Sequence, residues 1–127
     1  MIKRLTAAVL LAAALNLTAG AATAAPPKKI GAKVSIDFKN NGQFVFFGKV
    51  ESKSGRCERG RQVTVFREQE GNDFPVGGDK ADSGGRYKVD AGGSVMVNTN
   101  YYAKVAKKEL DGALCKATRS KNFQIED

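Results

Sequence analysis

The chain has 127 residues, of which 21 are basic and 13 acidic, and it contains two cysteines and neither histidine nor tryptophan. The missing histidine excludes Ser-His-Asp and Cys-His catalytic arrangements and removes a common zinc ligand. The length is that of one domain, and the net charge of +8 favours acidic partners.

Residues 1–24 have the layout of a secretory signal peptide. A short basic start precedes an apolar run from Leu5 to Leu17, and the segment closes on the small residues of Ala22-Thr23-Ala24. The apolar run is shorter than the roughly 20 residues that a membrane span requires. We therefore expect cleavage after Ala24 and no transmembrane span thereafter. The chain that follows Ala24 would be exported, either to the extracellular space or, where a second membrane exists, to the periplasm.

The two cysteines predict one disulfide. Removal of residues 1–24 would leave 103 residues with a net charge of +6, because that segment carries two of the basic residues and none of the acidic ones. An even cysteine count in a small exported domain indicates a bridge. Cys57 and Cys115 are 58 positions apart, and in the chain-entropy model closing such a loop stabilises the fold by about 4 kcal/mol. Two free buried thiols are the alternative. So wide a spacing is not that of metal ligands.

The first part of the remaining chain alternates apolar and polar residues, as half-buried strands do. Residues 25–31 are expected to form a flexible lead-in, because two prolines there cannot donate to a strand ladder. Residues 32–38 and 43–52 predict two strands around an Asn-Asn-Gly turn. Gly48, inside the second strand, predicts a bulge or a close approach of another backbone segment. The expected inward residues are Val34, Ile36, Phe38, Phe44, Phe46 and Val50.

The second part continues the same pattern. Residues 61–70 predict a strand, 71–79 a turn-rich connection, and 80–90 two short strands about a Ser-Gly-Gly turn. Residues 91–100 form a further loop with room for a short strand at 95–97. Strands around 101–108 and up to the C-terminus complete the pattern. The expected inward residues are Val63, Val65, Tyr87, Val89, Tyr101, Ala103, Val105, Phe123 and Ile125.

These segments amount to about seven short strands separated by turn residues, which predicts a single all-β domain over residues 32–127 with a two-layer sandwich architecture. Three segments in this order, residues 46–67, 80–89 and 101–120, resemble the transthyretin-like, or carboxypeptidase-regulatory-like, β-sandwich domains. More narrowly, the chain is similar to small secreted bacterial proteins made of one such domain. The loop at 91–100 departs from the larger family members, since it lacks their Pro-Gly before the tyrosine strand.

The resemblance implies a fold and a broad role. The fold is a seven-stranded Greek-key β-sandwich of the transthyretin (prealbumin) type, usually an accessory or interaction module, and no catalytic residue carries over. The acidic residues lie mostly beside lysine or arginine at polar positions, where we expect them to be solvated rather than catalytic. Asp73, Asp79 and Asp82 share a glycine-rich stretch, but their spacing matches no calcium loop. We expect Asp82 to accept backbone N–H groups at its turn.

Basic residues flank both cysteines, and a bridge would place the two groups at one end of the domain. A concentrated positive field there would attract acidic polymers. The alternative is that outward strand positions need polar side chains and that basic ones protect exposed sheet edges. The candidate anion-binding residues are Arg56, Arg59, Arg61, Lys116, Arg119 and Lys121.

We therefore expect an exported, non-catalytic module for extracellular or envelope interactions, without a metal or cofactor. The alternative function is binding of anionic wall polymers or polysaccharides through the basic groups beside the two cysteines. The candidate partners are an acidic envelope polymer or another protein. Nucleic acid is not expected, because the chain carries no recognisable nucleic-acid module.

Overall fold

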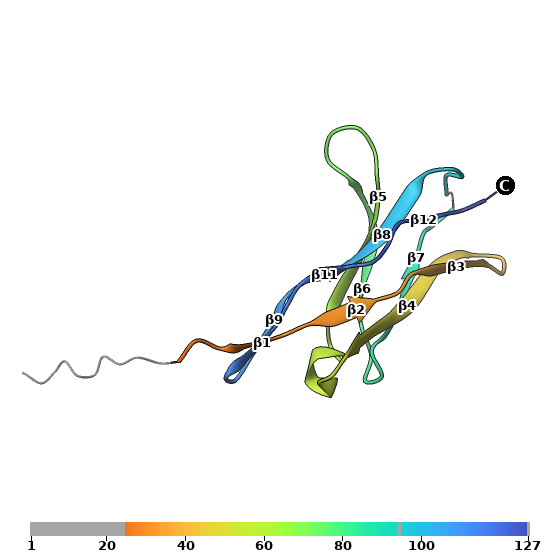
Figure 1. The fold of residues 1–127 in the computed structure, drawn as a ribbon. Coiled ribbons are helices and arrows are strands. Elements are labelled where there is room, and N and C mark those ends of the chain that lie inside the picture. The colour runs from red at the N-terminus through yellow and green to blue at the C-terminus, as the bar shows by residue number, and fades with distance from the viewer. Residues whose placement is uncertain (1–24, 94, 127) are drawn as a thin grey trace, which may run out of the picture.

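The computed structural model describes residues 25–93 and 95–126, so the expected signal peptide lies outside the described residues. Within them the chain forms twelve strands and one short 3-10 helix, η1 (Gly55–Cys57). Figure 1 shows how these elements are arranged. The strands are β1 (Lys28–Ile30), β2 (Ala32–Val34), β3 (Asp37–Asn40), β4 (Phe44–Ser52), β5 (Gln62–Arg67), β6 (Phe74–Lys80), β7 (Arg86–Asp90), β8 (Asn100–Val105), β9 (Lys108–Leu110), β10 (Ala113–Cys115), β11 (Thr118–Arg119) and β12 (Phe123–Gln124). No helix in this part of the chain is long and apolar enough to cross a membrane.

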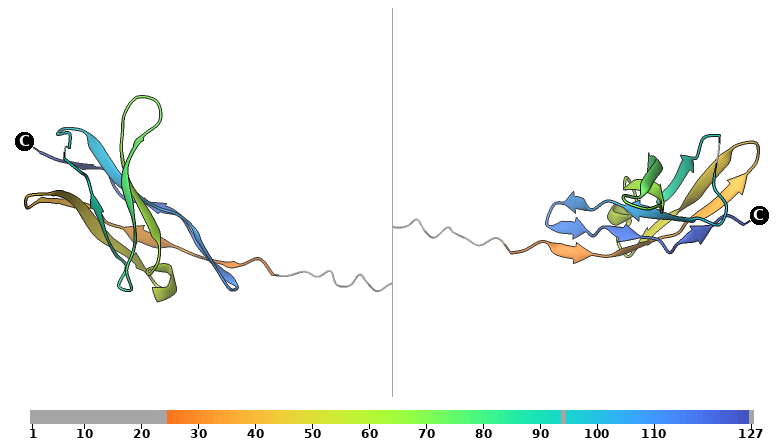
Figure 2. Two further views of the ribbon diagram at one scale, coloured as in Figure 1. Left: turned by 180° about the vertical axis from the view of Figure 1, so that it is seen from behind. Right: turned by 90° about the horizontal axis from the view of Figure 1, so that it is seen from above.

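Two antiparallel sheets form the body of the domain. In one, β4 pairs with β2 and β3 on one side and with β7 on the other; in the second, the order is β6-β5-β8, with β11 and β12 both paired to β8. Figure 2 shows the two groups of strands from behind and from above. Both sheets are open.

The core lies between these two sheets and confirms most of the expected inward positions. Phe46 of β4 meets Tyr101 of β8 across the interface, with ring centroids 4.7 Å apart. Because alternate residues of a strand share a face, each strand contributes every second side chain to this layer. The fully enclosed core residues are Phe46, Val50, Val63, Val65, Ala81, Tyr87, Val89, Tyr101, Ala103 and Val105.

The expected all-β class is confirmed, but the expected count of seven strands is wrong. The strand predicted at 32–38 divides into β2 and β3 at Ser35, whose side-chain Oγ accepts the N–H of Lys49 at 3.0 Å. Gly48 has the predicted close approach, since a Cβ there would lie 2.1 Å from the main-chain oxygen of Ser35.

Two connections also differ from the prediction. The segment 71–79, expected to be a turn-rich connection, contains most of β6, which pairs with β5 along its length despite its proline and two glycines. Pairing with a neighbouring strand overrides local propensity here, as it often does in sheets. The short strand considered at 95–97 is absent from the described residues. Met96 instead donates its N–H to the Tyr101 hydroxyl at 2.9 Å.

A third, smaller sheet has the order β1-β10-β9. β1 runs parallel to β10, and β9 and β10 form an antiparallel hairpin. β-structure therefore begins at Lys28, inside the segment expected to be a lead-in, rather than at Ala32. The predicted disulfide is confirmed: Cys57 at the end of η1 is bonded to Cys115 of β10. The bridge ties the small sheet to the body of the domain.

Candidate anion-binding site

The disulfide places η1 over one face of the small sheet. Ile30, Cys115 and Lys108 are register partners on β1, β10 and β9, so their side chains share a face. Cys115 reaches Cys57 from that face. Beside it, Lys108 donates from Nζ to the main-chain oxygens of Arg59 at 2.9 Å and Arg56 at 3.2 Å. The turn that carries Arg56 and Arg59 is thus held on β9 as well as on β10.

Four basic residues from three segments gather at this place. Gly60 donates its N–H to the Ala81 oxygen at 2.9 Å, which brings the end of β6 against the same turn. We call the set of Arg56, Arg59, Lys80 and Lys108 the cationic corner. Arg56, Arg59 and Lys80 are exposed, and Lys108 is half-buried.

The cationic corner is not neutralised by acidic side chains. Within the described residues, 25–93 and 95–126, one ion pair has a nitrogen–oxygen distance of 4.0 Å or less, and it joins Arg119 to Glu68. No member of the corner therefore has a carboxylate partner within that distance. Burial lowers the pKa of Lys108, and the positive charges of Arg59, Arg61, Lys80 and Arg56 lower that pKa further. A lysine whose pKa is depressed by like charges marks a concentrated positive potential.

Arg61, one of the candidate residues, is part of the scaffold and is not available to a ligand. Its side chain is 0% exposed. Its guanidinium donates to the main-chain oxygens of Cys57 at 2.7 Å, Ala106 at 2.8 Å and Lys116 at 2.8 Å. Burial lowers the pKa of this arginine. A buried charge needs such hydrogen bonds to offset the loss of water, which explains why three carbonyls converge on it.

Arg119, another candidate residue, makes its contacts outside the cationic corner. Its Nη2 donates to Glu68 Oε1 and to Asn122 Oδ1, both at 2.9 Å, and its guanidinium carbon lies 3.5 Å from the centroid of the Tyr102 ring. Tyr102 stacks in turn on Phe66 and donates to Asp73 Oδ2 at 2.5 Å. These contacts join β11 to β8 and to the β5–β6 hairpin, so Arg119 has a structural role there.

The six candidate residues therefore do not form one site. Arg56 and Arg59 belong to the cationic corner, and Lys116 follows β10, near Gly31 on the β1 side. Lys121 is exposed in the connection between β11 and β12. Sequence patterning missed Lys80, and it placed Lys108 in the basic group around Cys115 without including it among the candidate residues. Lys108 is one of several lysines preceding Cys115, but only its register opposite that cysteine distinguishes it from Lys107.

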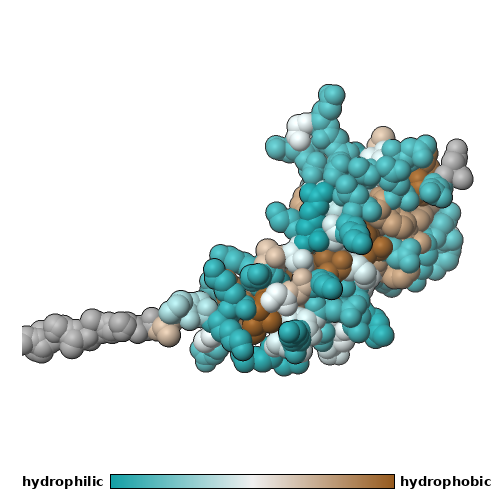
Figure 3. Space-filling model, in the orientation of Figure 1, coloured by the Kyte–Doolittle hydropathy of each residue, from teal (hydrophilic) through white to brown (hydrophobic). Residues whose placement is uncertain are grey.

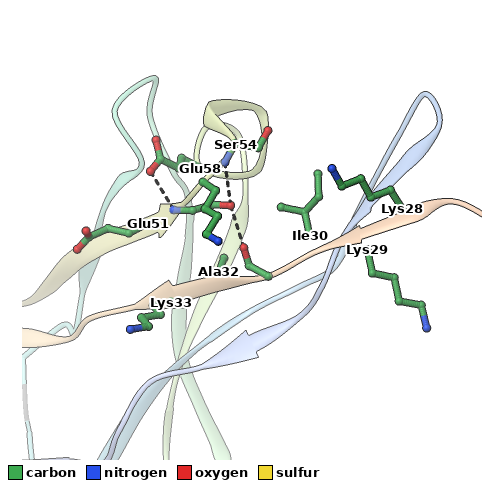
Figure 4. A pocket seen from close by; sticks show the side chains of 11 residues that line it. Lys28, Lys29, Ile30, Ala32, Lys33, Glu51, Ser54 and Glu58 are labelled. Carbon is green, nitrogen blue, oxygen red and sulfur yellow. Dashed lines mark hydrogen bonds between the residues drawn. The ribbon is translucent and has the colours of Figure 1, made fainter.

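A groove lies beside η1, between the β1–β2 segment and the end of β4 (Figure 4). Its volume is about 910 Å³. Ser52 donates from Oγ to the Gly31 oxygen at 2.8 Å, which fixes the two walls to each other. The lining residues are Lys28, Lys29, Ile30, Gly31, Ala32, Lys33, Glu51, Ser52, Lys53, Ser54 and Glu58.

The face drawn in Figure 3 is mostly hydrophilic, with hydrophobic residues exposed in a few separate places. In the described ranges, no three acidic or cysteine side chains come together in a way that could hold a metal ion. No family model, curated protein or solved structure matches this chain.

Proposed function

We propose that the protein is an exported, non-catalytic β-sandwich module of the transthyretin-like type that binds acidic polymers through the cationic corner. The single observation that carries the binding role is the convergence of Arg56, Arg59, Lys80 and Lys108 without a carboxylate partner. Like charges held together raise the free energy of the unbound protein. An anionic ligand at this place lowers it, which gives binding a favourable electrostatic contribution.

Two features support the non-catalytic, sandwich-like part of the proposal. The chain has no histidine, and both cysteines are in the disulfide. It therefore offers neither an imidazole nor a free thiolate for catalysis. The face-to-face packing of two antiparallel sheets fits a transthyretin-like Greek-key arrangement.

The test is binding to a heparin-coupled resin and to soluble heparin over a series of salt concentrations. Arg56→Gln/Arg59→Gln removes two exposed charges of the corner. Lys39→Gln/Lys88→Gln removes two exposed charges from β3 and β7 and serves as the matched control. The corner variant is expected to bind about twofold to fivefold more weakly per charge removed, and the control variant less than twofold. Affinity that ignores ionic strength, or equal losses in both variants, would contradict the proposed site.

Contact with another protein is the second candidate function. Phe74, on the edge strand β6, leaves 45% of its surface exposed although the Arg67 guanidinium lies over its ring. An open edge with an exposed aromatic side chain suits addition of a strand from a partner. Chemical cross-linking of the exported protein in its own envelope tests this: Phe74→Ser should lose protein adducts that wild type and Phe74→Tyr retain. Identical adducts in all three would exclude this edge as the contact.

A further inference from the structure

A small pocket lies on the sheet β6-β5-β8, over β8 and β11. Its volume is about 350 Å³, and its lining residues are Tyr102, Lys104, Ala117, Thr118 and Arg119. Lys104 and Arg119 are register partners on β8 and β11, and Tyr102 lies two positions before Lys104 on β8. The side chains of these three residues therefore share one face of the sheet. The residues between them on β8 belong to the core, so this face is the outer one.

The guanidinium of Arg119 is fixed in place without a ligand. Its Nη2 donates to Glu68 and to Asn122, and its carbon lies 3.5 Å from the centroid of the Tyr102 ring. A guanidinium has five N–H groups, and Nη2 carries two of them. Among the hydrogen bonds of the described residues, none uses the N–H groups on Nη1 or Nε of Arg119. This side chain, 47% exposed, therefore keeps free donors whose position its other contacts set.

Lys104 supplies a second cationic group beside Arg119. It is exposed, and in the part of the chain that the structure describes its ammonium group takes part in no ion pair. Because Lys104 and Arg119 are directly opposite each other on antiparallel strands, their Cβ atoms lie about 5 Å apart. An anion between the two side chains is attracted by both charges. Since Arg119 is already ordered, little conformational entropy is lost when it binds.

Two neighbouring carboxylates limit the charge of that anion. Asp73 accepts a hydrogen bond from the Tyr102 hydroxyl, and Glu68 is the ion-pair partner of Arg119. Burial raises the pKa of Tyr102, and the nearby Asp73 and Glu68 raise it further, whereas the charge of Arg119 lowers it. Both negative charges therefore act at the aromatic wall of the pocket. They repel a dianion such as phosphate more strongly than a singly charged carboxylate.

We propose that this pocket binds a small, singly charged carboxylic acid. One carboxylate oxygen accepts hydrogen bonds from the free N–H groups of Arg119, and the other faces the ammonium group of Lys104. The volume is near the lower end of the roughly 300–1,000 Å³ typical of ligand sites, which suits one small molecule. This site goes beyond the proposed function, because the cationic corner attracts polymers through several charges and the pocket recognises a single carboxylate.

The experiment titrates the full mature chain with glucuronate, with glucose as its uncharged counterpart, and with inorganic phosphate at a pH where phosphate is a dianion. NMR follows the ring of Tyr102 and the Nε–H of Arg119. Glucuronate is expected to give saturable shifts at both, glucose none, and phosphate at least about threefold weaker binding. Lys104→Gln should weaken glucuronate binding about twofold to fivefold. The control Lys88→Gln, on the other large sheet, should change it less than twofold.

The outcomes separate this proposal from the proposed function. Equal losses in Lys104→Gln and Lys88→Gln, phosphate binding as tight as glucuronate binding, or no saturable shift at Tyr102 and Arg119 would overturn the pocket assignment. If glucuronate shifts only residues of the cationic corner, the pocket assignment fails and the proposed function stands. If glucuronate binds at the pocket while no acidic polymer binds even at low salt, the proposed function fails and the pocket assignment stands.

Discussion

Arg61 donates a hydrogen bond of 2.8 Å from Nη2 to the main-chain oxygen of Lys116, although the two residues are 55 positions apart. The same guanidinium bonds the oxygens of Cys57 and Ala106. One buried side chain therefore joins the η1 turn, the end of β8 and the end of β10. This contact lies next to the disulfide and reinforces the same junction.

Replacement of Arg61 is expected to destabilise the fold. Arg61→Met keeps the stem but leaves three carbonyls without a donor, which should lower the free energy of unfolding by about 3 kcal/mol. Arg61→Lys should also destabilise, because an ammonium group cannot reproduce the planar fork of donors. Urea denaturation measures both, with the exposed Arg59→Gln as control, expected within about 0.5 kcal/mol of wild type. An Arg61→Met variant as stable as that control would contradict the structural role.

Loss of the disulfide is expected to destabilise the junction between η1 and the small sheet. Cys57→Ala/Cys115→Ala should lower the free energy of unfolding by about 2–5 kcal/mol, because the unfolded chain is no longer constrained across this loop. Denaturation with and without reductant gives the same comparison in the wild type. Alkylation of two thiols in the untreated, folded protein would show that the bridge does not form.

Gly48 is expected to tolerate no side chain. In Gly48→Ala the new Cβ would lie 2.1 Å from the Ser35 oxygen and 2.8 Å from a ring carbon of Tyr87. The Ser35 oxygen also accepts the Tyr87 hydroxyl at 2.7 Å, so it cannot move without losing that bond. We expect a loss of about 2–3 kcal/mol in thermal or urea unfolding. Gly93→Ala is the matched control, since its Cβ would have nothing within 4 Å, and similar losses in both variants would refute the steric explanation.

Asp82 is expected to make stability depend on pH in the acid range. The backbone N–H groups of Arg86 and Gly84 donate to its carboxylate, both at 2.9 Å, and lower its pKa below the ordinary value of 3.8. A carboxyl group whose pKa is depressed by folding stabilises the protein above its ordinary pKa, and this contribution disappears as the pH falls through the lower, folded value.

The check is urea denaturation of the wild type and Asp82→Asn from neutral pH to below 3.8. Asparagine retains an acceptor oxygen but does not titrate. The variant should therefore lose less stability on acidification than the wild type does. Parallel stability curves over the whole range would show that the turn does not depend on the charge of Asp82.

Local patterning in the sequence was sufficient to predict the β class, most of the core and the disulfide. Alternation alone placed Val63, Val65, Tyr87 and Val89 inward, because successive side chains of a strand must face opposite sides. Gly48 likewise indicated the close approach of a second backbone. The signal peptide, the family resemblance and the non-catalytic role stay predictions.

Only the tertiary structure decided what each basic residue does. Arg59 and Arg61 are two positions apart and alike in sequence, yet one is exposed in the cationic corner and the other is fully buried. The difference comes from carbonyls at Ala106 and Lys116, which reach Arg61 from 45 and 55 positions away. The same holds for Lys80, since its basic neighbours Arg59 and Lys108 belong to other segments of the chain. Alternation reports which face of a strand a residue occupies, and it carries no information about which distant segment will cover that face.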